Sequence, residues 1–359
     1  MTTSQPSGPL ETVPFVSGEG GYHTYRIPSL IVSPGGLLLA FCEGRHDGAG
    51  DSGSIGLLLR RSFDLGPTWG PVQVVASDGP NTMGNPCPVV DRDTGAIWLP
   101  LTRNLGEDDE GRIMAGTSKG TREVWLTSST DDGATWSSPV EITASTKAPD
   151  WTWYATGPGC GIQLRSGRLV IPCDHAVAGT GMWRSHVIYS DDRGDTWKLG
   201  GVLGDYTNEC QVVEREDGSL LINMRSYHGR NRRAIATSTD GGLTWSDVSL
   251  DDALVEPVCQ ASLVSLPGQD LGRANGLLFA NPASTEREKM TVRLSCDEGA
   301  TWPVAKVLYA GPSAYSALAA LPDGSIGCLY ERGEQWPYEQ LAFARFPLEW
   351  LTGGGGVPD

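Results

Sequence analysis

The chain has 359 residues, with 47 Gly, 24 Pro and 12 Trp, and a formal net charge of −16 at pH 7. This acidity repels nucleic acid at long range, so a nucleic-acid partner is not expected. No apolar run approaches the roughly 18 residues that a membrane span needs. The many turn residues between short alternating apolar runs predict an all-β chain, and its length favours a repeat fold over one ordinary domain.

One eight-residue motif, Ser-x-Asp-x-Gly-x-Thr-Trp, occurs five times along the chain. The copies begin at Ser62, Ser129, Ser190, Ser238 and Ser295. A short apolar or β-rich run precedes each copy, which predicts a strand, a tight turn and a further strand. Asp accepts hydrogen bonds from nearby amides and Gly tolerates positive φ, so the motif suits a structural turn better than a ligand-binding loop. This period, with about four short strands per repeat, predicts propeller blades.

Residues 1–20 are rich in Ser, Pro, Gly and Thr and are expected to form a polar lead-in. Arg26 then precedes Ile-Pro inside a strand-like run. Arg-Ile-Pro followed by five Asp boxes resembles the bacterial and animal exo-α-sialidases, the Asp-box glycoside hydrolases, over residues 21–351. The resemblance implies a single six-bladed β-propeller with Asp-box turns, whose remaining blade is closed by N- and C-terminal strands. Residues 352–359 are left as a Gly-rich tail.

A Gly-rich loop after residue 43 carries two aspartates, Asp47 and Asp51. Such a loop is mobile and polar and can close over a substrate. In the family, an Asp nine or ten residues before an Arg-Arg-Ser run is the general acid/base. Asp51 lies nine residues before Arg60 and matches better, while Asp47 remains the alternative. By the same resemblance, Arg45 is expected to support the site.

Further segments are candidates for the sugar pocket. In some relatives the residue aligned with Asn85 contacts the sugar, although here it can equally cap a turn. Trp151, Trp153 and Tyr154 precede Gly-Pro-Gly; the resemblance implies that they shape the pocket for the acyl substituent, and propeller core is the alternative. The charged segment 103–122 is too polar for a core and either borders the site or is solvated.

The segment around Glu209 is the most informative one. Glu209 and Glu214 have opposite parity in an extended strand, so they are expected to face opposite sides. The resemblance assigns Glu209 as the base that deprotonates the nucleophile. It assigns Arg26 and Arg225 as the first two of three arginines that bind the substrate carboxylate. Glu214 is expected on a solvated or inter-blade face.

Two arginines compete to be the third carboxylate ligand. In relatives this arginine lies in a loop after Asn-Pro, about six residues before a strand arginine, which favours Arg287 over Arg293. Tyr315, after Gly-Pro-Ser, matches the nucleophile segment by its order and its distance from the last box. Glu331 matches the glutamate that braces Arg26 in relatives.

The chemistry explains why these residue types occur together. Sialic acid carries its carboxylate on the anomeric carbon, and the planar guanidinium fork pairs with a carboxylate in a bidentate way. A carboxylate nucleophile would be repelled there, so a neutral phenol suits the reaction better, and sialidases with a Tyr nucleophile depart from the two-carboxylate scheme. Glu209 would take the Tyr315 proton. Asp51 would protonate the leaving oxygen and then activate water, giving net retention.

The expected function is therefore hydrolysis of terminal sialic acids on glycans, glycoproteins or glycolipids. The alternatives are a Kdn-preferring or trans-sialidase variant, and a catalytically silent sialic-acid-binding propeller. The eight Cys show no CxxC pair, and neither a metal nor another cofactor is expected. The first 25 residues lack a basic stretch followed by an apolar one, so the chain as written is expected to be cytoplasmic, or secreted if a signal has been removed.

Overall fold

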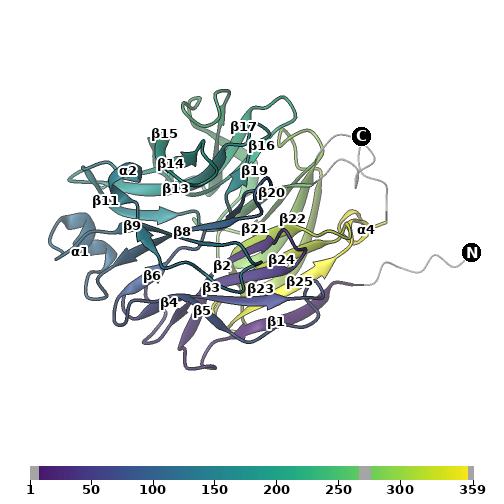
Figure 1. Cartoon of the computed structure of the whole chain (residues 1–359). Coiled ribbons are helices and arrows are strands. Elements are labelled where there is room, and N and C mark those ends of the chain that lie inside the picture. The colour runs from purple at the N-terminus through teal and green to yellow at the C-terminus, as the bar shows by residue number, and fades with distance from the viewer. Residues whose placement is uncertain (1–7, 267–275, 355–359) are drawn as a thin grey trace, which may run out of the picture.

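The computed structural model describes residues 8–266 and 276–354, and most of its regular structure is β-strand (Figure 1). This confirms the predicted all-β class. The parts of the expected lead-in and Gly-rich tail at residues 1–7 and 355–359 lie outside the described residues. Strands that follow one another in the chain mostly pair as antiparallel neighbours, as local hairpin repeats require.

The strands of these two ranges pair in four sheets. The first holds β2 (Thr24–Val32), β3 (Leu38–Arg45), β4 (Ile55–Ser62), β5 (Gln73–Ala76), β6 (Thr82–Gly84), β7 (Val89–Val90), β8 (Ile97–Asn104), β9 (Glu123–Ser129) and β10 (Val140–Glu141). The second holds β11 (Trp151–Thr156), β12 (Ile162–Gln163), β13 (Leu169–Val177), β14 (Trp183–Ser190) and β15 (Lys198–Asp205). The third holds β16 (Thr207–Glu214), β17 (Leu220–Ser226), β18 (Arg232–Ser238) and β19 (Ser249–Val255). The fourth holds β1 (Leu10–Val16), β20 (Ser262–Leu266), β21 (Gly276–Pro282), β22 (Glu288–Ser295), β23 (Val304–Ala320), β24 (Ile326–Arg332) and β25 (Gln340–Phe346).

The two largest of these sheets, with nine and seven strands, far exceed a four-stranded blade. The long strand β23 pairs with β22 up to Pro312 and with β24 from Ser313 onward. A parallel bridge between Ile55 and Thr82 likewise joins β4 to β6. At both places the strand pairing continues from one group of strands into the next, so the sheets do not separate into individual blades. The number of blades therefore stays a prediction.

The first and last strands of the described chain lie side by side. Figure 1 shows β1, in purple, along β25, in yellow, with Leu10 opposite Arg345. This confirms the predicted pairing of N- and C-terminal strands. A strand thus begins inside the stretch 1–20 that was expected to be a polar lead-in. Its inward side chain Phe15 is 2% exposed and packs in one cluster with Phe343 of β25, which the polar composition of the stretch conceals.

The five Asp boxes form the same hydrogen-bonded turn. In the second box, Ser129 Oγ donates to Asp131 Oδ1 at 2.8 Å, and the Gly133 amide donates to Ser129 Oγ at 3.0 Å. The Thr135 amide and hydroxyl donate to the two Asp131 oxygens at 2.9 and 2.6 Å. In every box the Gly and the residue before it have positive φ. The prediction that the boxes are structural turns is confirmed.

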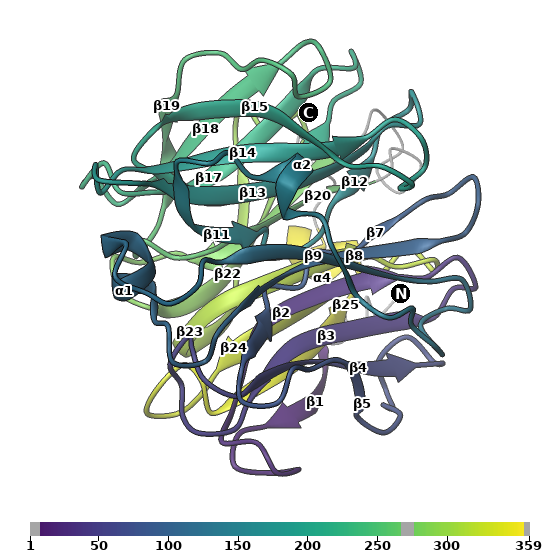
Figure 2. The same ribbon diagram turned by 60° about the vertical axis from the view of Figure 1, so that its left-hand side comes forward.

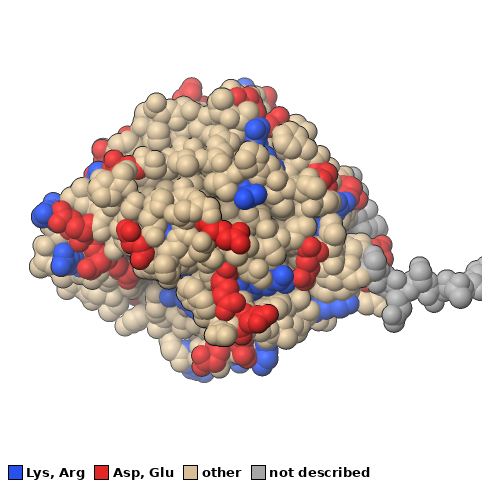
Figure 3. Space-filling model, turned by 90° about the horizontal axis from the view of Figure 1, so that it is seen from below, with Lys and Arg blue, Asp and Glu red and all other residues tan. Residues whose placement is uncertain are grey.

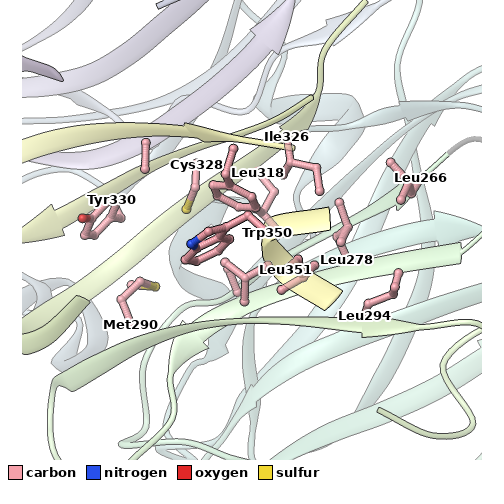
Figure 4. Packing of buried hydrophobic residues seen from close by; sticks show 14 of the residues in the cluster. Leu266, Leu278, Met290, Leu294, Leu318, Ile326, Cys328, Tyr330, Trp350 and Leu351 are labelled. Atoms are coloured by element: carbon pink, nitrogen blue, oxygen red, sulfur yellow. The ribbon is translucent and has the colours of Figure 1, made fainter. Parts of the chain in front are cut away.

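In the described ranges, three short helices accompany the sheets: α1 (Glu110–Ala115), α2 (Thr143–Thr146) and α4 (Leu348–Thr352). Figure 2 shows α1 beside β11, which it contacts. Helix α4 inserts Trp350 and Leu351 into a buried cluster with Leu318, Cys328 and Tyr330 (Figure 4). The C-terminal helix therefore seals part of the core on the last strands.

Acidic side chains are spread over the face shown in Figure 3, with fewer basic ones between them, as the net charge of −16 implies. Within residues 8–266 and 276–354, no helix is long and apolar enough to cross a membrane.

Candidate active site

One cavity of about 310 Å³ collects most of the predicted site residues, and all four sheets contribute to its lining. The predicted residues that line it are Arg26, Arg45, Asp51, Asn85, Trp153, Glu209, Arg225, Arg287 and Tyr315. Residues nearly 290 positions apart in the chain thus meet at one place.

The Tyr315 phenol is held against Glu209. Tyr315 is 5% exposed and lies on β23 within a register irregularity between Ser313 and Ser316. Its hydroxyl donates to Glu209 Oε1 at 2.5 Å. Burial raises the pKa of Tyr315 well above its ordinary value, the Glu209 charge raises it further, and the nearby arginines oppose the shift. The phenol is therefore neutral and hydrogen-bonded to a carboxylate that can take its proton.

Arg225 joins the same pair from β17. Its Nη1 donates to Glu209 Oε2 at 2.8 Å and to the Tyr315 hydroxyl at 3.3 Å. Glu214, at the other end of β16, instead lies near Arg165, with 2.8 Å between its Oε2 and the Arg165 amide. The predicted separation of the two glutamates is confirmed.

Glu331 connects Arg26 to the Tyr315 segment. Its Oε1 accepts from Arg26 Nε at 3.1 Å and from the Ile27 amide at 3.0 Å. Its Oε2 accepts from the Tyr315 amide at 3.0 Å. Arg26 Nη2 is buried and has no hydrogen-bond partner among the described residues. Glu331 braces Arg26 as expected, and one donor of this guanidinium remains for a ligand.

The structure separates the two candidates for the third arginine. Arg287 lines the cavity, with its guanidinium carbon 5.7 Å from the Tyr315 ring centroid and a hydrogen bond to the Tyr338 hydroxyl. The Ser313 amide donates to the Arg287 carbonyl at 2.8 Å, which ties this loop to β23. Arg293 lies within β22, across from Phe279, and is not part of the described cavity lining.

The structure also separates the two loop aspartates. Asp51 lines the cavity, and its Oδ1 lies 2.7 Å from Arg45 Nη2 and 3.4 Å from Arg26 Nη1. Asp47 is not among the described lining residues. Burial alone would raise the pKa of Asp51, but the charges of Arg45 and Arg26 outweigh it and hold this pKa below its ordinary value. Arg45 also donates to the carbonyls of Ala49 and Gly50, at 2.5 and 3.0 Å, so it shapes the loop that carries Asp51.

Only part of the expected sugar pocket reaches the cavity. Asn85 and Trp153 line it, whereas Trp151 and Tyr154 lie in a buried cluster behind it. A regular strand would place Trp151 and Trp153 on one face and Tyr154 on the other. The pairing of β11 with β13 is irregular between Trp151 and Tyr154. This irregularity puts both of those rings into the core and leaves Trp153 at the cavity.

Comparison with known proteins identifies the family. Residues 35–328 match the BNR repeat-like domain family. The chain is 38% identical to a sialidase of Micromonospora viridifaciens over 94% of this chain and 54% of that protein. It is 32% identical to human sialidase-3 over 90% of this chain and 89% of that protein. The chain belongs to the sialidase family. The solved structure of Hadza microbial sialidase Hz136, 32% identical, matches it with a TM-score of 0.88 over 95% of this chain and 69% of that chain.

These relationships confirm the recognition from Arg-Ile-Pro and the Asp boxes, and they confirm the β-propeller fold. The chain spans about half the length of the Micromonospora viridifaciens protein and 61% of a sialidase of Bacteroides fragilis.

Several residues that line the cavity were not predicted from the sequence. They are Ile27, Glu43, Glu110, Arg122, Ala155, Asp174, Trp183, Asn208, Tyr227 and Tyr338. Glu110 and Arg122 belong to the segment 103–122, which therefore borders the site. Its charge was the available signal, but nothing in the sequence showed which of its residues turn inward.

Burial raises the pKa of Asp174 well above its ordinary value, and the Glu209 charge acts in the same direction.

The cavity is not uniformly cationic. Its lining includes five arginines and five carboxyl-bearing residues, so the arginines do not outnumber them. The positive charge is concentrated around Tyr315, because Arg26, Arg225 and Arg287 all lie near its ring or its hydroxyl. An anion would therefore be attracted to this part of the cavity.

The chain also has a larger and more apolar cavity, of about 660 Å³, lined by residues such as Leu30, Val89, Ile162, Val213 and Leu318. None of the predicted site residues lines it. The smaller cavity is the candidate active site, because there a buried phenol is hydrogen-bonded to a carboxylate among grouped arginines.

Proposed function

We propose that this chain is a retaining exo-α-sialidase that releases terminal α-linked sialic acids from glycoconjugates. The observation that carries this proposal is the neutral Tyr315 phenol bonded to Glu209 at 2.5 Å beside Arg26, Arg225 and Arg287. Membership of the sialidase family supports it. The substrates of the whole protein, glycoproteins or glycolipids, belong to the same proposal.

Substrate binding follows from the arginines. A carboxylate placed between Arg26, Arg225 and Arg287 would receive charge-assisted hydrogen bonds. It would include the buried Nη2 of Arg26, which has no partner in the described part of the chain. Because the carboxylate is attached to the anomeric carbon, this binding would also bring that carbon toward the Tyr315 hydroxyl.

In the first displacement, the Tyr315 oxygen attacks the anomeric carbon while its proton passes to Glu209 Oε1. The bond from that carbon to the aglycone oxygen breaks, and Asp51 donates a proton to the departing oxygen. In the second, Asp51 takes a proton from water, and the water oxygen attacks the same carbon. The Tyr315 oxygen then leaves and recovers its proton from Glu209. Two inversions at one carbon give net retention.

The test is hydrolysis of fluorogenic α-glycosides of Neu5Ac and Kdn by the purified chain in the presence of EDTA. We expect release from Neu5Ac, with free sialic acid as the α-anomer first. Tyr315→Phe should lower kcat by about 1,000-fold or more while substrate binding persists. Tyr309→Phe is the matched control, since Tyr309 lies on the same strand and its hydroxyl donates to the Gly333 carbonyl, away from the cavity.

A slow 2,3-difluoro sialic acid should leave a covalent adduct on the peptide that contains Tyr315. An adduct on another residue would remove Tyr315 as nucleophile. A product that lacks one molecule of water relative to free sialic acid would favour the intramolecular trans-sialidase instead. Binding of sialosides without any turnover would replace the hydrolase by a sialic-acid-binding propeller.

A further inference from the structure

Arg122 is a buried cation of the cavity that the proposed mechanism does not use. Its side chain is 2% exposed, and it has no ion pair with a carboxylate in the described ranges of the chain. Its nitrogens all donate to neutral oxygens: Nε to the Tyr154 carbonyl at 3.0 Å, Nη1 to Asn104 Oδ1 at 2.6 Å, and Nη2 to Asn85 Oδ1. Its guanidinium carbon lies 3.9 Å from the Trp153 ring centroid. Arg122 thus contacts both predicted pocket residues that reach the cavity.

These contacts determine the orientation of the Asn85 carboxamide. A guanidinium has donors and no acceptor, so the Asn85 atom that faces Arg122 must be the oxygen. Thr102 Oγ1 donates to the same oxygen at 2.9 Å. The amide nitrogen Nδ2 is left at the other end, with no partner among the described residues. Asn85 therefore presents a donor to a ligand.

The backbone of Asn85 is held as firmly as its side chain. Its φ is +55°, a region that Asn tolerates better than most residues. Its amide donates to Glu43 Oε1 at 2.8 Å, and its carbonyl accepts from Thr156 Oγ1 at 2.5 Å. The carboxamide thus cannot turn its oxygen to a ligand without breaking its bonds to Arg122.

We propose that Arg122 is a positioning residue that makes Asn85 an obligate hydrogen-bond donor to one hydroxyl or carbonyl oxygen of the bound sugar and supports the Trp153 wall. By this means it sets which nonulosonic acids the cavity accepts. The inference rests on the proposed function and deepens it. Arg122 differs from Arg26 in its free donors. The three side-chain nitrogens of Arg122 all donate to neutral oxygens, whereas Nη2 of Arg26 has no hydrogen-bond partner among the described residues.

An unpaired buried charge is costly, so its replacement by an apolar side chain of similar volume is compatible with folding. Burial lowers the pKa of Arg122 to about 10, although the charges of Glu43 and Asp51 act in the opposite direction. The lowered pKa reflects the free-energy cost of keeping this charge buried. Arg122→Met is therefore a usable variant. Arg122→Lys keeps a cation and one donor and serves as the conservative comparison.

The experiment measures how each variant discriminates among mono-deoxy analogues of 2,3-didehydro-Neu5Ac, each lacking one hydroxyl, together with the Kdn counterpart. Dissociation constants come from calorimetry, so the readout does not require turnover. Wild-type chain should lose about tenfold in affinity for the analogue that lacks the oxygen met by Asn85. Asn85→Ala should erase this discrimination, and Arg122→Met should erase it as well. Arg122→Lys should restore part of it.

Arg103→Met is the matched control, because Arg103 lies nearby on β8 but pairs with Asp78 and Glu123 outside the cavity. It should leave the discrimination unchanged. The double variant Arg122→Met/Asn85→Ala should discriminate no less than Asn85→Ala alone. If Arg122→Met instead weakens the parent and every analogue by one common factor, Arg122 is only structural and the proposal fails.

Two further outcomes separate this inference from the proposed function. A wild-type chain that binds the analogues but hydrolyses no sialoside would end the proposed function and leave the test of Arg122 in force. A wild-type chain that binds none of them would overturn both. Equal affinity of the wild type for every analogue would overturn the role of Asn85, and with it that of Arg122.

Discussion

At the scale of single residues, Glu331 would couple substrate binding to nucleophilic attack in the proposed mechanism. One of its oxygens accepts a hydrogen bond from Arg26 and the other from the Tyr315 amide, so the proposed carboxylate ligand and the proposed nucleophile share one buried partner. A carboxylate that accepts several hydrogen bonds in a buried setting stays in a single orientation. The position of Arg26 relative to the Tyr315 backbone is therefore set before any substrate arrives.

The ranking of two arginines tests the carboxylate site. Arg287→Ala should raise KM by about 30-fold or more, since removing one partner of a buried charge pair costs about 2 kcal/mol or more. Arg293→Ala should change KM by less than about threefold, because Arg293 lies within β22 and outside the cavity lining. Steady-state kinetics on one Neu5Ac glycoside measures both. The opposite ranking would show that the third arginine is assigned wrongly.

The acid role of Asp51 predicts a specific pH dependence. Arg45 and Arg26 hold the pKa of Asp51 below its ordinary value, so the free protein would lose the required proton at low pH. A bound substrate carboxylate would neutralise Arg26 and exclude water, and both effects raise the pKa of Asp51.

Because kcat/KM reports the free enzyme and kcat the complex, the alkaline fall of kcat should lie at higher pH than that of kcat/KM. Asp51→Asn should remove most activity on a natural sialoside and much less on an aryl glycoside whose leaving group needs no proton. Coincident alkaline limbs would contradict the acid role of Asp51.

At the scale of elements, the Asp box joins a turn to the core beside it. Gly194 of the third box has φ +99°, and a Cβ there would lie 2.1 Å from Cε2 of the Trp98 ring. The box glycine therefore serves twice: it permits the backbone conformation and lets an aromatic ring from another sheet lie against the turn.

Two glycines with similar backbone separate these effects. Gly167 has φ +93°, and no atom lies within 4 Å of the position that a Cβ would take there, so Gly167→Ala adds only backbone strain, about 1–2 kcal/mol. Gly194→Ala adds the displacement of Trp98 and should cost about 1–3 kcal/mol more. Urea unfolding of both variants measures the difference. Equal losses would mean that the contact with Trp98 is relieved without cost.

At the scale of the whole molecule, the sequence predicts what repeats or follows a fixed order. The boxes identify the turns, and the order from Arg26 to Tyr315 locates residues that meet in one cavity. The sequence does not predict the positions of side chains that depend on tertiary packing. Trp151 and Tyr154 enter the core because the pairing of β11 with its neighbour β13 is irregular between them. Arg122 is held at the cavity by side chains from two distant segments of its own sheet region, Asn85 and Asn104, and by the Tyr154 carbonyl in another sheet.

The first strand, β1, is the clearest case of packing that the sequence does not predict, and the last prediction concerns this strand. Nothing near Phe15 in the sequence marks it as core, because its partner strand lies at the other end of the chain. It packs with Phe343 and lies 5.2 Å from the Tyr25 ring, centroid to centroid. Phe15→Ala should therefore lower the free energy of unfolding by about 3–5 kcal/mol. Val13→Ala, in the same strand but 38% exposed, should cost less than about 1 kcal/mol.

The effect of Phe15→Ala is measured by thermal unfolding together with the hydrolytic activity that remains after heating. Tyr25 is adjacent to Arg26 in β2, so loosening of β1 reaches the strand that carries the first carboxylate ligand. Activity of Phe15→Ala should then be lost at the same lowered temperature as its folded structure. A variant that keeps wild-type stability would show that pairing of the two chain ends contributes little. Loss of structure without a matching loss of activity would separate β1 from the strands that hold the site.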